Sequence, residues 1–407
     1  MFRIGRTALP RPAELRARSI FGSAAVSSAA AFLTSLLKPV GICYALTVAI
    51  ALAAQRKLQY FPTAEKPGPA SLAHPMFSSI EEHEVRASDG TRCYLWHWPA
   101  PALNNIPMRP FYLREPQASA AASTMAELRR EHPQFQGIDV VQFHGNAGSR
   151  MHRLAFMHLL RDGLGCSVTV LDYRGFGGSE GSPTEHGLIA DGRAAYDWVR
   201  ARQAADQRLS STIPMANIVD DSSPVDETGR YSGRRHVVLW GESIGSGVAV
   251  ALLDEEIAKQ PAPARAPSDT SLVLEAGFSS CVDLGAHAYP WLPVRLGMLD
   301  RFESEGRARR MAAALGNDDA ASFASLALHG DRDEIAPLEF GQRLHDALPG
   351  GKRKRIVVLP QTGHNDIAFV DTARYLREIA DFFAAEVVAR KERSADGGTR
   401  DKAPAVI

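Results

Sequence analysis

The chain contains the run His236-Val-Val-Leu-Trp-Gly-Glu-Ser-Ile-Gly245, which continues as Ser246-Gly-Val-Ala-Val-Ala-Leu-Leu253. The first part is short and almost wholly apolar, which is typical of a strand buried on both faces. The second part reads as a helix. Between them lies a Gly-x-Ser-x-Gly motif centred on Ser243, where so tight a turn needs flanking glycines to avoid clashes. Such a turn exposes the hydroxyl at the C-terminal edge of a sheet, so we expect Ser243 to be a nucleophile.

A serine hydroxyl is a poor nucleophile near neutral pH and needs an adjacent base. His364 lies in Gln361-Thr-Gly-His-Asn-Asp366, which follows the last expected strand and precedes the terminal helix. This placement brings His364 to the same edge of the sheet as the motif serine. The other histidines lack that position or have a plainer structural explanation, so His364 is the expected base.

The base needs a carboxylate that fixes its tautomer and stabilises its charged form. The run Leu328-His-Gly-Asp-Arg-Asp-Glu-Ile-Ala-Pro337 follows a strand and offers Asp333, which we expect in this role. Asp331 is expected to cap the loop. Glu275, which follows the preceding strand, is the alternative acid. The order serine, aspartate, histidine along the chain is that of α/β hydrolases.

A fourth component stabilises the negative oxygen that develops during acyl transfer. The run Phe143-His-Gly-Asn-Ala-Gly-Ser149 follows a strand and opens a helix, where a backbone donor belongs. We expect the amides of Asn146 and Ile244 to form this oxyanion hole, and each such donor is worth roughly 10²–10³ in rate. His144 is expected to brace the loop and not to act as a base.

Short apolar runs recur on both sides of the serine motif and alternate with helical segments. This alternation predicts an α/β domain over residues 80–390, with a mostly parallel eight-stranded sheet flanked by helices. Besides residues 236–240, the strands that we expect are 92–98, 138–143, 166–171, 271–274, 325–328 and 355–359. A small cap is expected between the sixth and seventh core strands, within Phe278–Arg310.

Three segments interrupt the alternation, namely 101–136, 203–235 and 260–270. They are rich in Ala, Pro, Ser and charged residues and have no sustained periodicity. We therefore expect surface insertions that are partly disordered. The tail 391–407 is expected to be disordered as well.

The composition argues against several functions. The chain has 407 residues, of which 45% are hydrophobic, and its 46 basic residues balance 46 acidic ones, which argues against nucleic-acid binding. The glycines of Asp172–Gly181 do not fit a dinucleotide-binding loop, so Asp172 and Arg174 are expected to make structural contacts. We expect free thiols, with neither a metal site nor disulfides, at the scattered residues Cys43, Cys93, Cys166 and Cys281.

The N-terminal region predicts a membrane anchor. Residues 1–30 form a basic leader, and the apolar run Val40–Ala54 follows. As a helix this run would reach about 22 Å, short of the roughly 30 Å hydrocarbon core. Extension back to residue 31 supplies the length but includes Lys38 and Pro39. We expect a single-pass transmembrane anchor at 31–54, in an endomembrane.

Two other interpretations of the N-terminus stay open. The tripeptide Ala51-Leu-Ala53 resembles a signal-peptide cleavage site, although the lead-in of 39 residues is long for a signal peptide. The arginine-rich, acid-poor start also resembles a mitochondrial transit peptide, so a mitochondrial location is the alternative.

Four motifs in order resemble one branch of the α/β-hydrolase superfamily: His144–Gly148, Leu171–Gly181, Gly241–Gly245 and Gly363–Asp366. This branch is the membrane-anchored alpha/beta hydrolase domain-containing protein thirteen and its fungal and bacterial relatives. Arg56-Lys-Leu-Gln-Tyr-Phe-Pro62 is similar to the junction between anchor and catalytic domain in that branch. The resemblance implies a triad of Ser243, Asp333 and His364. The three insertions and the arginine-rich leader depart from the pattern.

These observations predict a serine hydrolase that cleaves ester or thioester acyl bonds through an acyl-enzyme and needs neither metal nor cofactor. Its expected partners are the acyl substrate and the membrane, with no nucleic acid and no signal for an oligomeric state. Apolar cap residues in Ala288–Pro293 and Leu296–Leu299 favour lipid or lipidated-protein substrates, unless they simply pack in the core. The alternatives are a serine peptidase of the same fold and a catalytically silent, membrane-tethered scaffold.

Overall fold

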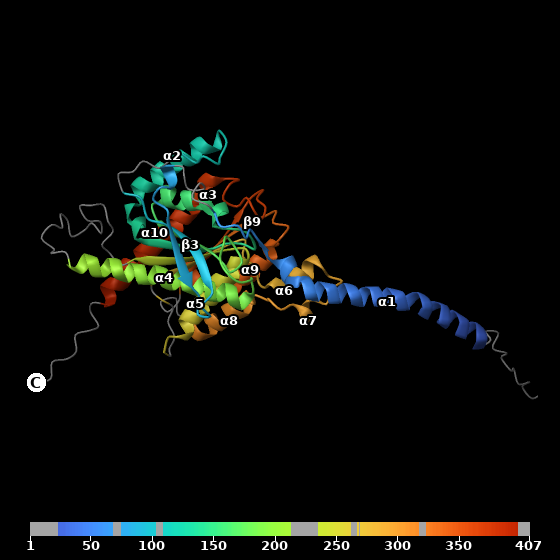
Figure 1. The fold of residues 1–407 in the computed structure, drawn as a ribbon. Helices are drawn as coiled ribbons and strands as arrows, with labels where there is room; N and C mark the ends of the chain where they lie inside the picture. The colour runs from blue at the N-terminus through green and yellow to red at the C-terminus, as the bar shows by residue number, and fades with distance from the viewer. Residues whose placement is uncertain are drawn as a thin grey trace, which may run out of the picture. The chain divides into compact units, whose positions relative to one another are not determined.

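The computed structural model describes residues 23–67, 75–102, 109–212, 235–261, 267, 269–316 and 323–397 (Figure 1). The chain divides into two compact units, residues 1–54 and residues 55–407. Helix α1 (Ser23–Gln59) makes up the described part of the first unit, and its last turn belongs to the second. Within α1 the 23-residue span Leu37–Gln59 is long and apolar enough to cross a membrane. Most of the expected basic leader lies outside the described residues.

The second unit is built around an eight-stranded sheet with the order β10-β9-β8-β7-β4-β6-β3-β2. Its strands are β2 (Glu81–Arg86), β3 (Arg92–Trp98), β4 (Ile138–Phe143), β6 (Ser167–Asp172), β7 (His236–Glu242), β8 (Thr270–Glu275), β9 (Ser325–Gly330) and β10 (Lys354–Leu359). Only the pairings of β3 with β2 and with β6 are antiparallel. The predicted mostly parallel sheet is confirmed, and β2 is the strand that the sequence pattern did not locate.

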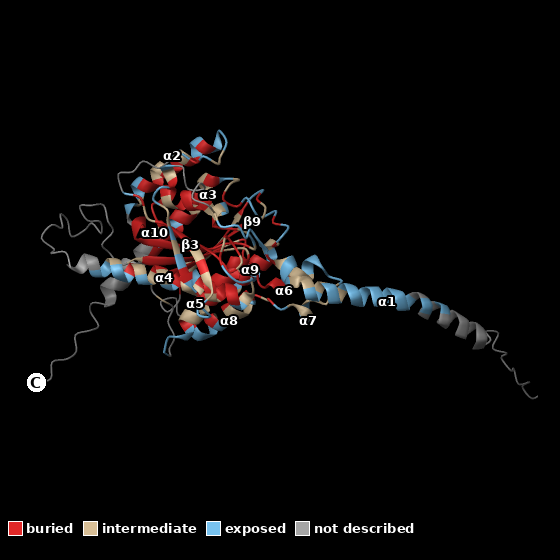
Figure 2. Ribbon diagram, viewed as in Figure 1, coloured by how far each residue is buried: buried red, intermediate tan, exposed pale blue. Residues whose placement is uncertain are grey.

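Two hydrophobic cores lie on the two faces of this sheet, because successive residues of a strand point to opposite sides. In β7, Leu239 belongs to one core, whereas Val238 and Trp240 belong to the other. The first core is covered by α4 (Glu185–Thr212), α5 (Ile244–Ala258), α8 (Ser304–Leu315) and α9 (Leu338–Ala347). The second is covered by α2 (Gln117–Glu131), α3 (Leu154–His158) and α10 (Thr372–Gly397). Figure 2 shows the buried residues gathered in the sheet and beneath these helices.

Shorter elements complete the unit. A small sheet pairs β1 (Phe61–Pro62) with β5 (Ala147–Gly148) in parallel. Tight helical turns are η2 (Pro75–Phe77), η3 (Pro133–Gly137), η4 (Arg150–Arg153), the π-helical η5 (Leu159–Leu164) and η7 (Gly351–Arg353).

A cap segment lies between β8 and β9, the sixth and seventh strands of the large sheet, as expected. It contains α6 (Cys281–Ala288), α7 (Val294–Gly297) and α8. Three of its large apolar side chains lie outside the core, since Tyr289 is 49% exposed, Trp291 55% and Leu296 90%. Simple core packing is therefore the wrong explanation for these side chains.

The expected insertions have different outcomes. Within 101–136, helix α2 buries Ala121 and Met125 completely, so the expectation of an irregular surface segment is wrong for this helix. Small alanines at helical spacing form part of an apolar face, and this face packs on α10 and η5. Helix α4 extends to Thr212, and residues 213–234 and 262–266 lie outside the described part of the chain. Helix α10 reaches Gly397, which is further than expected, and the remaining tail lies outside the description.

Candidate active site

The motif serine occupies a strained turn between β7 and α5. Ser243 has φ 52° and ψ −118°, a conformation that non-glycine residues rarely adopt. A side chain at Gly245 would collide with the carbonyl of Phe143, and one at Gly241 would collide with the backbone of Ser246. Both glycines are therefore required for the strand and the helix to meet at this angle. Backbone strain of this kind is concentrated at functional sites.

The predicted base and acid converge on this serine from loops that follow β9 and β10. His364 Nε2 lies 2.9 Å from Ser243 Oγ, and His364 Nδ1 lies 2.7 Å from Asp333 Oδ2. The other carboxylate oxygen of Asp333 accepts hydrogen bonds from the amides of Ile335 and Ala336, at 3.0 and 2.7 Å. The three side chains thus form one hydrogen-bonded series, with the carboxylate at its buried end.

The alternative acid lies in a different environment. Glu275 Oε2 accepts hydrogen bonds from Trp240 Nε1 and from the hydroxyl of Tyr375, at 3.2 and 3.1 Å. The carboxylate that contacts His364 is that of Asp333 and not that of Glu275. Glu275 contributes to the serine turn through its backbone, because its carbonyl accepts a hydrogen bond from the Ser243 amide at 2.8 Å.

The carboxylates of Asp333 and Glu275 have pKa values that are shifted in opposite directions. Burial alone would raise the pKa of Asp333, but the hydrogen bonds and charge of His364 and the Ala336 amide hold that pKa below its ordinary value. Burial, followed by the nearby charge of Glu242, raises the pKa of Glu275 to about 7. Asp333 is therefore the carboxylate that is ionised at neutral pH and suited to stabilise an imidazolium.

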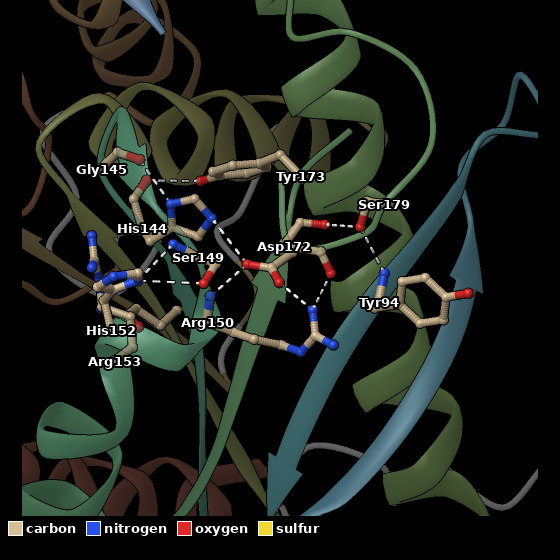
Figure 3. A network of polar contacts seen from close by, with 12 residues as sticks. Tyr94, His144, Gly145, Ser149, Arg150, His152, Arg153, Asp172, Tyr173 and Ser179 are labelled. Atoms are coloured by element: carbon tan, nitrogen blue, oxygen red, sulfur yellow. Dashed lines mark hydrogen bonds and ion pairs between the residues drawn. The ribbon is translucent and has the colours of Figure 1, made fainter. Parts of the chain in front are cut away.

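The loop expected to supply an oxyanion donor passes beside the serine turn. A Cβ added at Gly145 would lie 3.6 Å from that of Ser243. His144 Nδ1 donates to the carbonyl of Gly145 at 2.7 Å, and the hydroxyl of Tyr173 donates to the carbonyl of His144 at 3.2 Å (Figure 3). Burial, followed by the charge of Arg153, lowers the pKa of His144 to about 3. The imidazole is therefore neutral at physiological pH and braces the loop.

A buried ion pair between Arg150 and Asp172 lies beside this loop. Asp172 is fully buried and accepts hydrogen bonds from the backbone amide and the guanidinium of Arg150 (Figure 3). The same guanidinium donates to the carbonyl of Gly177 at 2.9 Å and to Glu82 at 2.7 Å. Arg174 pairs with the buried Asp191 at 2.8 Å. The glycine-rich loop after β6 is thus a packed structural element.

Sequence reasoning missed the ion pair that lies beside the serine turn. Arg153 donates from Nε and Nη2 to the carboxylate of Glu242, at 2.7 and 2.8 Å. Glu242 occupies the unspecified position of the motif directly before the serine. Gln142 Nε2 donates a hydrogen bond to its carboxylate at 3.1 Å. No local pattern identifies partners 89 positions apart. Among the described residues, no group of three or more His, Cys, Asp or Glu side chains is arranged to hold a metal ion.

Comparisons with known proteins agree with this fold. A family model described as the alpha/beta hydrolase fold matches residues 140–329. The uncharacterized protein Rv2307c of Mycobacterium tuberculosis is 30% identical over 334 residues, which cover 82% of this chain and 89% of that protein. Human protein ABHD12B is 32% identical over 231 residues, 54% of each chain. Zebrafish (Danio rerio) lysophosphatidylserine lipase ABHD12 is 25% identical over 301 residues, 73% of this chain and 64% of that one.

The fold and the family model define a hydrolase of the α/β type. The chain belongs to the α/β-hydrolase superfamily and is similar to ABHD-type proteins, which agrees with the superfamily that the four sequence motifs indicated.

Proposed function

We propose that this hydrolase cleaves ester or thioester acyl bonds, with Ser243 as nucleophile, His364 as general base and Asp333 as the orienting carboxylate. The observation that carries the proposal is the hydrogen-bonded series from Ser243 Oγ through the imidazole to Asp333, with separations of 2.9 and 2.7 Å. Both distances are within hydrogen-bond reach, which proton transfer between nucleophile and base requires.

The reaction follows from this arrangement. Ser243 Oγ attacks the substrate carbonyl carbon as its proton passes to His364 Nε2, and the charge on the imidazolium is balanced by Asp333. The carbonyl oxygen becomes negative and accepts hydrogen bonds from the amides of Asn146 and Ile244. His364 then gives its proton to the leaving alcohol or thiol. Water, deprotonated by the same imidazole, hydrolyses the acyl-enzyme and restores the serine.

A lipid ester or a lipidated protein is the substrate class that we favour. The cap segment presents Tyr289, Trp291, Leu296 and Leu299 to solvent, and clustered exposed apolar side chains are typical of surfaces that contact apolar partners. The span Leu37–Gln59 supports a single-pass anchor, which we assign to an endomembrane. A relative, zebrafish ABHD12, is named as a lysophosphatidylserine lipase, which agrees with a lipid ester.

A serine-directed fluorophosphonate tests the nucleophile. The wild-type protein should be labelled, Ser243→Ala should not, and the exposed Ser182→Ala should be labelled like wild type. Labelling that persists in Ser243→Ala contradicts the assignment, and a wild-type protein that is never labelled favours the silent scaffold. Rates on p-nitrophenyl acyl esters of increasing chain length, compared with aminoacyl amides, then distinguish an esterase from a peptidase.

A further inference from the structure

The end of helix α1 and the segment that follows it are hydrogen bonded to residues 143–149, the loop expected to supply an oxyanion donor and called the oxyanion loop below. Strand β1 pairs with β5, so that Phe61 is opposite Ala147 and Pro62 is opposite Gly148. The amide of Phe61 donates to the carbonyl of Asn146 at 2.8 Å, and the amide of Thr63 donates to that of Gly148 at 3.0 Å. The side-chain amide of Asn146 donates to the carbonyl of Gln59 at 2.9 Å.

These contacts fix the backbone on both sides of Asn146. The peptide that carries the Asn146 amide includes the carbonyl of Gly145, which accepts a hydrogen bond from His144 at 2.7 Å. The next peptide includes the carbonyl of Asn146, which is held by Phe61. Because a peptide unit is planar, holding both carbonyls restrains the two backbone torsions of Asn146. The direction of its N–H therefore depends on Phe61 and Gln59 as well as on His144.

The segment Gln55–Thr63 is itself held firmly by the rest of the second unit. The ring of Tyr60 is buried in the first hydrophobic core, at 3% exposure. Arg56 Nε donates to the buried carboxylate of Asp300 at 2.8 Å, and Gln59 Nε2 donates to the backbone carbonyl of Asp300 at 3.0 Å. At the other end, the amide of Gly177 donates to the carbonyl of Thr63 at 2.7 Å. A segment fixed at both ends and in its middle is a rigid support for the loop.

We propose that the segment Gln59–Thr63 positions the Asn146 amide for transition-state stabilisation. The proposal rests on the proposed function, since it concerns the same oxyanion hole. Its residues are positioning residues that act through Asn146 and do not touch the substrate. A displaced donor should reduce the rate of the chemical step more than substrate binding, because the oxyanion exists only in the transition state and the intermediate.

The sharpest test compares Phe61→Pro with Phe61→Ala in the full chain. Both variants lose an aromatic ring that is 53% exposed, but only proline also removes the N–H that donates to Asn146. Relative to Phe61→Ala, we expect Phe61→Pro to lower kcat on a p-nitrophenyl ester by roughly 10–100-fold, with little change in KM. Thermal unfolding of both variants checks that the fold is kept.

A thionoester substrate provides a readout that a general structural defect would not alter. Its carbonyl sulfur is a weak hydrogen-bond acceptor, so an intact oxyanion hole favours the oxygen ester over the thionoester. The ester-to-thionoester rate ratio should be smaller in Phe61→Pro than in Phe61→Ala. Equal kcat values and equal ratios in the two variants would overturn the proposal, and so would a loss of kcat without a change in the ratio.

A second variant tests the contact from the loop side. Asn146→Ala keeps the backbone amide but removes the side-chain hydrogen bond to Gln59. This variant should also lower both kcat and the ester-to-thionoester rate ratio. If Phe61→Pro does not fold, Asn146→Ala becomes the test of the proposal. An unchanged ratio in Asn146→Ala would then overturn the proposal. If Ser243→Ala keeps full activity, the proposed function itself has failed, which is a separate outcome.

Discussion

Arg153 makes a two-pronged ion pair with Glu242, the residue directly before the motif serine, at 2.7 and 2.8 Å. The pair joins η4, which follows the oxyanion loop, to the end of β7. Both side chains are mostly buried, since 14% of the Arg153 side chain and 25% of the Glu242 side chain are exposed. The carboxylate of Glu242 also acts on Glu275, whose pKa it helps to raise. Arg153 therefore neutralises the more exposed of two neighbouring carboxylates.

Loss of Arg153 should destabilise the fold. Arg153→Met keeps much of the aliphatic chain but leaves Glu242 partly buried without its cation, which should lower the free energy of unfolding by roughly 1–3 kcal/mol. Arg309→Met is the control, because Arg309 is 70% exposed and its pair with Glu305 should be worth at most about 0.5 kcal/mol. Urea denaturation measures both. Equal effects of the two substitutions would contradict a special role for Arg153.

The raised pKa of Glu275 should appear in the dependence of stability on pH. An unfolded glutamate titrates near 4.5, whereas Glu275 in the folded protein titrates at about 7. Between these values the folded state binds more protons than the unfolded state, so stability falls as the pH rises through this window. Glu275→Gln retains an oxygen that accepts from Trp240 and Tyr375 but cannot ionise.

The free energy of unfolding of Glu275→Gln should therefore vary less between pH 4.5 and 7 than that of wild type. Above pH 7 the variant should be more stable by roughly 1–3 kcal/mol. Urea denaturation of both proteins at several pH values across the window gives the comparison. Parallel pH profiles for the two proteins would show that Glu275 does not titrate there.

Substitution of the two candidate acids should have different effects on the kinetics. Asp333→Asn should lower kcat by roughly 10³–10⁴-fold, because an amide neither balances the imidazolium nor favours the required tautomer. Glu275→Gln should keep most of the wild-type activity, since its carboxylate contacts Trp240 and Tyr375 instead of the base. Initial rates on a p-nitrophenyl ester distinguish the two variants. The reverse pattern would assign the acid role to Glu275.

Local patterns in the sequence predicted most of the sheet and located the side chains that converge at its edge. Strand β7 and the turn at Ser243 have strong local signals, namely a continuous apolar run and glycines at fixed spacing. The position of His364 follows from its place after the last strand, because the C-terminal ends of parallel strands share one edge. For these features the physical cause lies within a few neighbouring residues.

The features that were missed depend on pairing or packing with other segments of the chain. Strand β2 is half exposed and charged, and it becomes a strand by pairing with β3. The apolar face of helix α2 consists partly of small alanines, which give a weak sequence signal. Its burial becomes evident only when the helix packs on α10. The pairing of Phe61 with Ala147 joins segments whose own sequences carry no strand pattern. Each of these is a tertiary effect that overrides weak local propensity.

The contact between β1 and β5 limits how this protein can be shortened to obtain a soluble enzyme. The last turn of α1 and the strand after it look like dispensable linker next to a hydrophobic helix. A recombinant form that starts at Glu81, where the first strand of the large sheet begins, would lack the donors at Phe61 and Thr63. One that starts at Gln55 would retain them and is the better choice for crystallisation and for kinetic work.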